Sequence, residues 1–145
     1  MKKTDAIVKL LLPAIENKTI LEVACGSADF SISASSYATD VFCIDLVDTR
    51  LDSRIQRDHI HFEVMDASLM RYPDKTFDSV FVYNALSHIE QQWEAIENEC
   101  KRVLKRNGKI YIIGSWKIDI SLIDSMFAGE AKWNDGFYIV ERKKN

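Results

Sequence analysis

Strand-like and helix-like segments alternate along this chain, and the alternation is the feature that most limits its fold. Apolar segments typical of β-strands are expected at residues 19–23, 40–44, 61–64, 77–83 and 109–114. Helices are expected between them, at residues 29–37 and 49–57 and from Trp93 to the C-cap pair Asn107-Gly108. Because right-handed crossovers place helices on both faces of parallel strands, this order predicts an α/β fold with a doubly wound, mostly parallel sheet.

The two ends of the sequence add a helix each and a final strand. An N-terminal helix is expected over about residues 4–15, capped by Thr4 and interrupted at Pro13. Near the other end, a helix at 121–128 precedes KWNDGFYIV, in which Asn134-Asp135-Gly136 is typical of a hairpin turn. The strand after this turn is therefore expected to be antiparallel and to join the parallel sheet.

Length and charge limit the class of protein further. At 145 residues the chain is expected to form a single domain, residues 1–145, with its own core. A formal net charge of −3 argues against a nucleic-acid partner, which would favour a basic surface. No apolar run approaches the roughly 18 residues that a membrane span needs, so no membrane partner is expected.

The three cysteines, Cys25, Cys43 and Cys100, indicate a reducing environment. Their number is odd and no C-x-x-C spacing occurs, which argues against a disulfide framework and against a metal site. The expected location is the cytoplasm. Cys25 and Cys43 are interpreted as small buried packing groups rather than nucleophiles.

The segment LEVACGSADF, residues 21–30, is the first candidate for a binding loop. It joins the first strand to a helix, and in doubly wound sheets ligands bind beyond the carboxyl ends of the strands. Gly26 allows a positive φ and a close approach to the backbone, but the G-x-G-x-x-G pattern of a pyrophosphate site is absent. By itself the segment fits a plain strand-to-helix turn equally well.

Two acids at neighbouring strand ends favour a binding site. Asp45 ends the second strand, where a carboxylate can accept hydrogen bonds from both hydroxyls of a ribose. Asp66 ends the third strand, where a carboxylate could accept a bond from an adenine amino group. Each acid alone is also typical of a helix N-cap or a solvated loop. Three successive strand ends thus carry a turn of small residues, then Asp45, then Asp66. This combination favours a ligand that contains a nucleoside.

These motifs together resemble those of the class I S-adenosylmethionine-dependent methyltransferases, of the type related to ubiquinone and menaquinone methyltransferases. The resemblance covers about residues 5–115. Residues 21–28, LEVACGSA, resemble the family's first motif L-[DE]-V-G-C-G-x-G, and FDSVFVYNALSHI resembles FDxVxxxxxLxH. The stretch VLKRNGK resembles the family's L-K-P-G-G. The resemblance implies S-adenosylmethionine as the cofactor and a Rossmann-like fold.

The resemblance also implies roles for individual residues. Glu22 would lie near the methionyl amino group, with the backbone at Ala24 and Gly26 lining the cofactor. Asp45 would hold the ribose. The other implied contacts are Leu46 near the adenine, Asp66 and Ala67 at the adenine edge, and Asn84 and Ala85 beside the sulfonium.

The loop departs from the family pattern at two glycine positions. Ala24 is compatible with the turn if its φ is negative. A methyl group at Ala28 is expected to crowd the methionyl end or to push the helix away, at a cost of about 1 kcal/mol if the backbone is strained.

The sequence indicates less about the acceptor of the methyl group. His88 is the candidate general base, because it follows the fourth strand at the same sheet edge; a solvent-facing histidine is the plain alternative. Methyltransferases that act on nucleobase amino groups have the tetrapeptide motif N/D-P-P-Y/F after the fourth strand, whereas this chain has NALS at residues 84–87. No long segment is available to cover a substrate, so either the pocket is open or a second copy completes it in a homodimer.

Two functions are therefore considered. The first is S-adenosylmethionine-dependent methyl transfer to a small molecule or an exposed protein group. The alternative is a non-catalytic methyltransferase-like protein that acts through a protein partner. A different nucleotide-binding activity, such as an NAD-linked enzyme, is disfavoured by the absent G-x-G-x-x-G.

Overall fold

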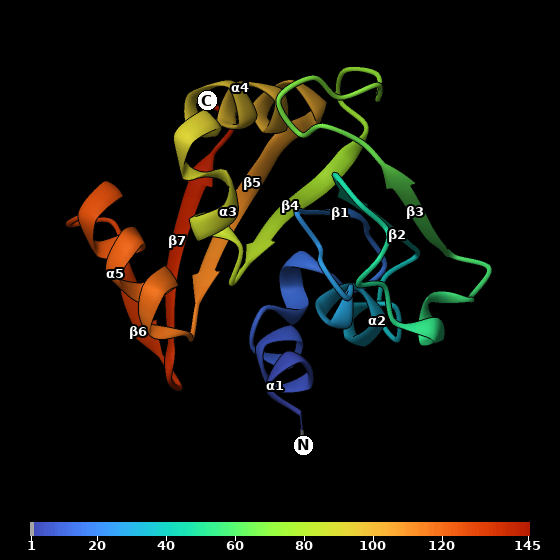
Figure 1. Cartoon of the computed structure of the whole chain (residues 1–145), viewed down its shortest axis with the longest axis horizontal. Coiled ribbons are helices and arrows are strands. Elements are labelled where there is room, and N and C mark those ends of the chain that lie inside the picture. Colours follow the sequence, from blue (N-terminus) through green and yellow to red (C-terminus); the bar gives the residue numbers. More distant parts are fainter. Residues whose placement is uncertain (1) are drawn as a thin grey trace.

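One seven-stranded sheet runs through the computed structural model, which describes residues 2–145 (Figure 1). Its strands lie in the order β3-β2-β1-β4-β5-β7-β6. The first five strands of this order are parallel, whereas β7 is antiparallel to both of its neighbours. The predicted doubly wound α/β sheet with an antiparallel terminal strand is confirmed. The strands are β1 (Thr19–Val23), β2 (Asp40–Asp45), β3 (Ile60–Val64), β4 (Phe77–Tyr83), β5 (Leu104–Gly114), β6 (Lys132–Asn134) and β7 (Phe137–Lys143).

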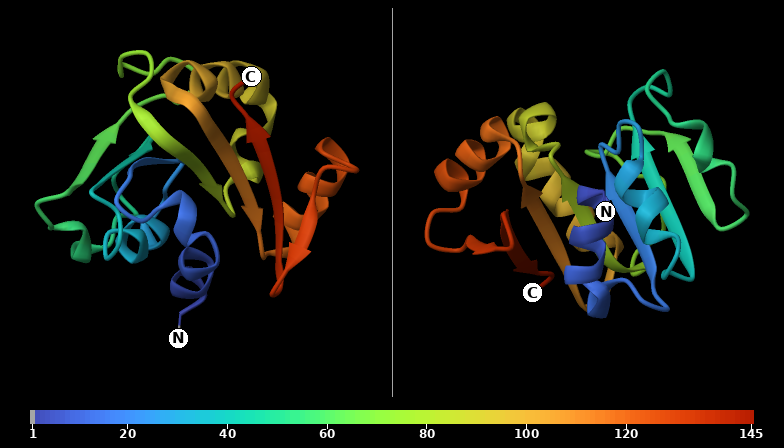
Figure 2. Two further views of the ribbon diagram at one scale, coloured as in Figure 1. Left: turned by 180° about the vertical axis from the view of Figure 1, so that it is seen from behind. Right: turned by 90° about the horizontal axis from the view of Figure 1, so that it is seen from below.

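Helices cover both faces of the sheet, as Figure 2 shows. Short 3₁₀ turns supplement them at η1 (Leu12–Ala14), η2 (Ser53–Ile55) and η3 (Glu90–Gln92). None of the helices within residues 2–145 is long and apolar enough to cross a membrane. The α-helices are α1 (Lys3–Leu10), α2 (Asp29–Ala34), α3 (Leu86–Ile89), α4 (Trp93–Val103) and α5 (Lys117–Met126).

The alternation of side chains along β1 divides the core into two clusters. Ile20 packs with α1 and α2 on one face, while Leu21 and Val23 pack with α4 and α5 on the other. All three side chains are fully buried. Burial on both faces explains why β1 is a nearly continuous apolar run, and it fixes the carboxyl end of β1 in the middle of the sheet.

The expected helix C-cap at Asn107-Gly108 is wrong. Helix α4 ends at Val103, and Asn107 and Gly108 lie inside β5, where the pairing with β4 shifts register between Phe77 and Ser79. Asn107 has a φ of 68° in this bulge. The pair that resembles a helix cap therefore lies at a bulge in the sheet, where Asn107 takes the left-handed backbone that is also common at helix caps.

The predicted helix boundaries at the two ends also need correction. Helix α1 ends at Leu10, before the 3₁₀ turn that contains Pro13. Thr4 does not cap this helix: it is buried and accepts a 2.8 Å hydrogen bond from Ser33 Oγ of α2. Helix α5 begins at Lys117, four residues before the expected start. The helix expected at 49–57 is reduced to η2.

Candidate functional site

Two adjoining cavities lie where the strand order reverses, between β1 and its neighbours β2 and β4. The first cavity has a volume of about 470 Å³ and the second about 70 Å³. Ala24, Arg50 and His88 line both. This is the position at which open α/β sheets bind their ligands.

Every residue that the sequence singled out lines one of these cavities, although the residues come from four separate strand ends. Their individual roles remain predictions. The first cavity contains Glu22, Ala24, Gly26, Asn84, Ala85 and His88. The second contains Ala24, Asp45, Leu46, Asp66, Ala67 and His88.

The Asp45 carboxylate joins the turn after β1 to the end of β2. Its Oδ2 accepts a 2.8 Å hydrogen bond from the Gly26 backbone N–H, and its Oδ1 accepts one of 2.7 Å from Leu46. Arg50 also donates to Oδ2, but over 3.4 Å and from a half-exposed side chain. Since each carboxylate oxygen can accept two bonds, ribose hydroxyls could take the place of this long contact.

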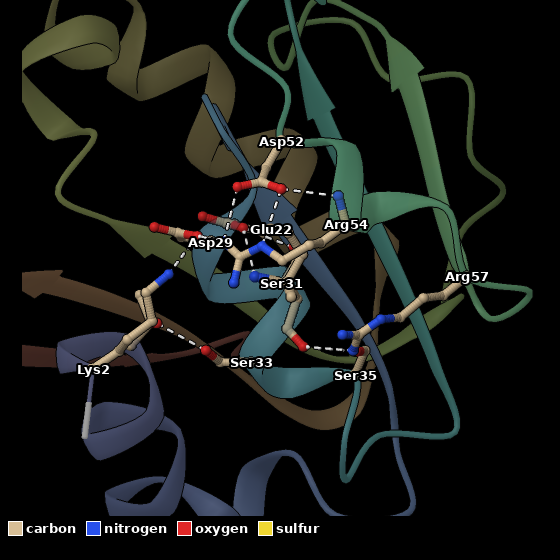
Figure 3. Close-up of polar contacts among 11 residues, drawn as sticks. Lys2, Glu22, Asp29, Ser31, Ser33, Ser35, Asp52, Arg54 and Arg57 are labelled. Carbon is tan, nitrogen blue, oxygen red and sulfur yellow. Dashed lines mark hydrogen bonds and ion pairs between the residues drawn. The ribbon is translucent and has the colours of Figure 1, made fainter.

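Glu22 is buried and lines the first cavity. Its Oε1 accepts hydrogen bonds from Ser31 Oγ at 2.7 Å and from the Ser31 backbone N–H at 3.2 Å (Figure 3). Burial raises the pKa of this carboxyl group well above its ordinary value, against the smaller opposing effect of Ser31. Oε2 makes no hydrogen bond within residues 2–145, so it is available to a donor in the cavity.

Asp66 occupies the outer edge of the second cavity and is exposed. Its Oδ1 accepts bonds from the Ser68 hydroxyl at 2.7 Å and the Ser68 N–H at 2.9 Å, and these bonds lower the pKa of Asp66. The carboxylate is therefore charged and held in one orientation. Its Oδ2 has no partner in the part of the chain that the structure describes.

Asn84 fixes the end of β4 against the end of β5. Its Oδ1 accepts hydrogen bonds from the backbone N–H groups of Ser115 at 2.8 Å and Trp116 at 3.2 Å, and its Nδ2 donates to Ser115 Oγ. The residue is buried and has a φ of 47°, a conformation that asparagine tolerates better than most residues. Asn84 thus shapes the wall of the first cavity and is held in place by both ends of its amide.

The turn after β1 places three alternating residues in the left-handed region. Ala24, Gly26 and Ala28 have φ values of 55°, 57° and 67°. The negative φ that would make Ala24 strain-free is therefore not present, and both alanines carry strain. The methyl group of Ala28, however, is fully buried in the core with α1 and α2 and does not line the first cavity. This position of the methyl group gives no support to the expected crowding of the methionyl end.

Several lining residues were not among the predicted site residues. Lys2 and Lys3 reach the first cavity from α1, and Arg50 lies over Gly26 from the loop after β2. Tyr83 and Trp116 complete its wall. Trp116 had a signal in the sequence, an aromatic residue directly after the fifth strand, whereas the two lysines lie far from every strand end.

Residues 21–112 match the protein family described as Methyltransferase domain. The chain belongs to this methyltransferase family. The resemblance to class I S-adenosylmethionine-dependent methyltransferases is thereby confirmed, as are the class of enzyme and the cofactor at the level of the family.

Two curated relatives are similar to the sheet-forming part of this methyltransferase-family chain. Demethylmenaquinone methyltransferase from Leptospira interrogans is 32% identical over 99 residues, which cover 61% of this chain. The 27-O-demethylrifamycin SV methyltransferase from Amycolatopsis mediterranei is 28% identical over 109 residues, which cover 69%. Each match covers 39% of the relative, so the chain spans about two-fifths of the length of these proteins.

A solved structure extends the similarity to the whole fold. A SAM dependent methyltransferase from Aquifex aeolicus has a TM-score of 0.76 at 16% identity, covering 99% of this chain and 90% of that one. The arrangement described here, β6 and β7 included, therefore occurs in a methyltransferase structure of similar length.

Proposed function

We propose that this protein transfers a methyl group from S-adenosylmethionine to an acceptor bound in the first cavity. The observation that carries the proposal is the convergence of all ten predicted residues on two cavities that share Ala24 and His88. Four strand ends contribute, and each supplies the chemistry that one part of the cofactor requires. A plain strand-to-helix turn would not require acids at two further strand ends.

The residues around the cavities fit this cofactor. Glu22 has Oε2 available for an amino group, and Asp66 has Oδ2 available for an exocyclic amine. Asp45 would hold the ribose once the ribose hydroxyls replace Arg50 in its long contact with Oδ2. The second cavity is smaller than a purine base, so the half-exposed side chains of Arg50 and Leu46 would move aside for the adenine.

S-adenosylmethionine supplies a methyl group on a positively charged sulfur. The acceptor's nucleophilic atom gains the methyl group, the sulfur keeps the bonding electron pair, and any proton on the acceptor passes to His88 or to water. His88 is suited to this role because it lines both cavities and its ring makes no hydrogen bond within residues 2–145. Asn84 and Ala85 would hold the wall beside the reacting atoms.

Two features of the sequence favour the non-catalytic alternative: the alanines at two glycine positions of the loop and the lack of a long segment to cover a substrate. Ala28 points into the core and leaves the first cavity open, which removes the main reason to expect a closed loop. The backbone at Ala24 has the left-handed geometry that glycine would give it. A working cofactor loop is therefore the better-supported reading.

Calorimetric titration with S-adenosylmethionine and S-adenosylhomocysteine, with NAD as the control, tests the proposal. Binding of only the two adenosyl compounds at micromolar concentration is expected. A His88→Gln variant should keep this affinity and lose methyl transfer to acceptors that must release a proton. If millimolar cofactor does not bind, the proposal is wrong and a role through a protein partner takes its place.

The proposal extends to the acceptor and the assembly. The acceptor is a small molecule or an exposed protein group, and a second copy of the chain covers the first cavity in a homodimer. Trp116 supports this, because its side chain is 58% exposed beside the cavity. Sedimentation at several concentrations tests the dimer.

The buried free thiols of Cys25, Cys43 and Cys100 support a cytoplasmic location.

A further inference from the structure

The first turn of α1 forms a basic wall of the first cavity. Lys2, Lys3 and Thr4 line it, although they lie outside the motifs of the sheet. Two contacts fix this turn to α2: Ser33 Oγ donates to Thr4 Oγ1 at 2.8 Å, and Lys2 Nζ lies 3.4 Å from Asp29 Oδ1 (Figure 3). The two lysines therefore belong to the cavity wall.

Positive charge outweighs negative charge around this cavity. Its lining contains three cationic side chains, Lys2, Lys3 and Arg50, and two carboxyl groups, Glu22 and Asp29. Asp29 is already paired with Arg54 at 2.6 Å and with Lys2. Burial favours the protonated, uncharged form of Glu22. The cavity is thus basic in a chain whose formal net charge is −3.

This charge exceeds what the cofactor needs. Lys2 pairs with Asp29 and Arg50 with Asp45, whereas Lys3 makes no ion pair within residues 2–145. The cofactor would bring one carboxylate and two positive charges, the methionyl ammonium and the sulfonium, and Arg50 could pair with that carboxylate once its long contact with Asp45 is given up. Lys3 then remains for another anion in a confined space where screening by salt is weaker than on an open surface.

Aromatic side chains form another part of the wall. Phe30 and Tyr83 stack with their ring centroids 5.6 Å apart, and both line the cavity. Trp116 faces it from the start of α5 with more than half of its side chain exposed. Flat apolar surfaces beside a cation suit a ring that carries an acidic group.

We propose that the methyl acceptor is a small aromatic molecule with a negatively charged group, which Lys3 holds at the mouth of the first cavity. The inference rests on the proposed methyl transfer, because it assigns the acceptor to the part of the cavity that the cofactor leaves free. Lys3 acts here as a specificity residue for the acceptor.

Calorimetry on the whole chain, saturated with S-adenosylhomocysteine, tests the assignment with two probes. 4-Hydroxybenzoate carries the charge, and 4-hydroxybenzamide has nearly the same shape without it. The acid is expected to bind about tenfold more tightly, because Lys3 can donate a charge-assisted hydrogen bond to its carboxylate. Lys3→Gln should remove most of this preference. Lys9→Gln, an exposed lysine of α1 outside the cavity, should leave it unchanged.

The outcomes separate this inference from the proposed function. Equal affinity for acid and amide, or no binding of either, would overturn the aromatic acid as acceptor while leaving cofactor binding intact. If Lys3→Gln instead weakens S-adenosylhomocysteine but not 5′-methylthioadenosine, which lacks the carboxylate, Lys3 serves the cofactor and the assignment is wrong. Failure of S-adenosylhomocysteine to bind the unmodified chain would overturn the proposed function itself; the same two probes then test the basic cavity alone.

Discussion

The backbone N–H of Gly26 donates a 2.8 Å hydrogen bond to Oδ2 of Asp45, which joins the turn after β1 to the end of β2. A residue expected to hold the ribose therefore also holds the loop that would surround the cofactor. Binding and local stability are coupled through one buried carboxylate.

Substitution of Asp45 by alanine should affect both properties. Loss of the acceptor for Gly26 and Leu46 leaves two backbone donors without a partner, so we expect unfolding to become easier by about 1–3 kcal/mol. Affinity for S-adenosylhomocysteine should fall by a similar amount. Urea unfolding and calorimetry measure the two effects. The control is Asp66→Ala: the exposed Asp66 carboxylate accepts hydrogen bonds from Ser68 alone within residues 2–145, so cofactor affinity should fall with little change in stability. Unchanged affinity in the Asp45 variant would show that the ribose lies elsewhere.

The buried carboxyl of Glu22 should make stability depend on pH. Because its pKa is raised in the folded protein, folding takes up a proton at pH values between the unfolded and folded pKa. Stability contributed at this site therefore falls as pH rises through that window. Glu22→Gln should unfold at higher urea concentration than the unsubstituted chain at pH 8 and equally at pH 4, because glutamine resembles the protonated form. Parallel pH profiles for the two proteins would contradict this account.

The two strained alanines should respond differently to glycine. Ala24→Gly relieves about 1–2 kcal/mol of left-handed strain and adds about 0.5–1 kcal/mol of chain entropy, so a net stabilisation of up to about 1 kcal/mol is expected. Ala28→Gly also removes a fully buried methyl group, which costs about 0.8 kcal/mol, and should bring no gain. Thermal unfolding of both variants checks the difference. A larger gain at position 28 would mean that its methyl group is crowded.

The bulge in β5 should tolerate no side chain at Gly108. A Cβ there would lie 2.8 Å from Leu104 Cδ2, 2.9 Å from the Lys105 carbonyl oxygen and 3.0 Å from that of Asp78. Gly108→Ala should therefore destabilise the protein by about 1–3 kcal/mol in urea unfolding. Gly136→Ala is the matched control: it introduces strain at a φ of 85° but meets no atom within 4 Å. An unchanged unfolding midpoint for Gly108→Ala would show that the neighbouring atoms move to accommodate the methyl group.

Much of the site could be predicted because parallel strands end at one sheet edge. Once the strands are recognised in the sequence, Asp45 and Asp66 can be assigned to that edge without knowledge of their side-chain contacts. Lys2 and Lys3 could not be found in this way, since they reach the cavity only through the packing of α1 on α2. The role of Asn107-Gly108 was ambiguous for a related reason: a helix cap and a β-bulge can both place a residue in left-handed backbone, and the pairing of β4 with β5 distinguishes them.

The position of β7 between β5 and β6 has a consequence for the newly made chain. One edge of β5 pairs with β4, and its other edge pairs with β7, which begins more than twenty residues later in the chain. That second edge stays unpaired until β7 has left the ribosome. During that interval β5 offers the apolar residues Ile110, Ile112 and Ile113 beside an open strand edge, the kind of surface that pairs with other chains. Released chains that end before Phe137 should therefore be the ones that chaperones hold.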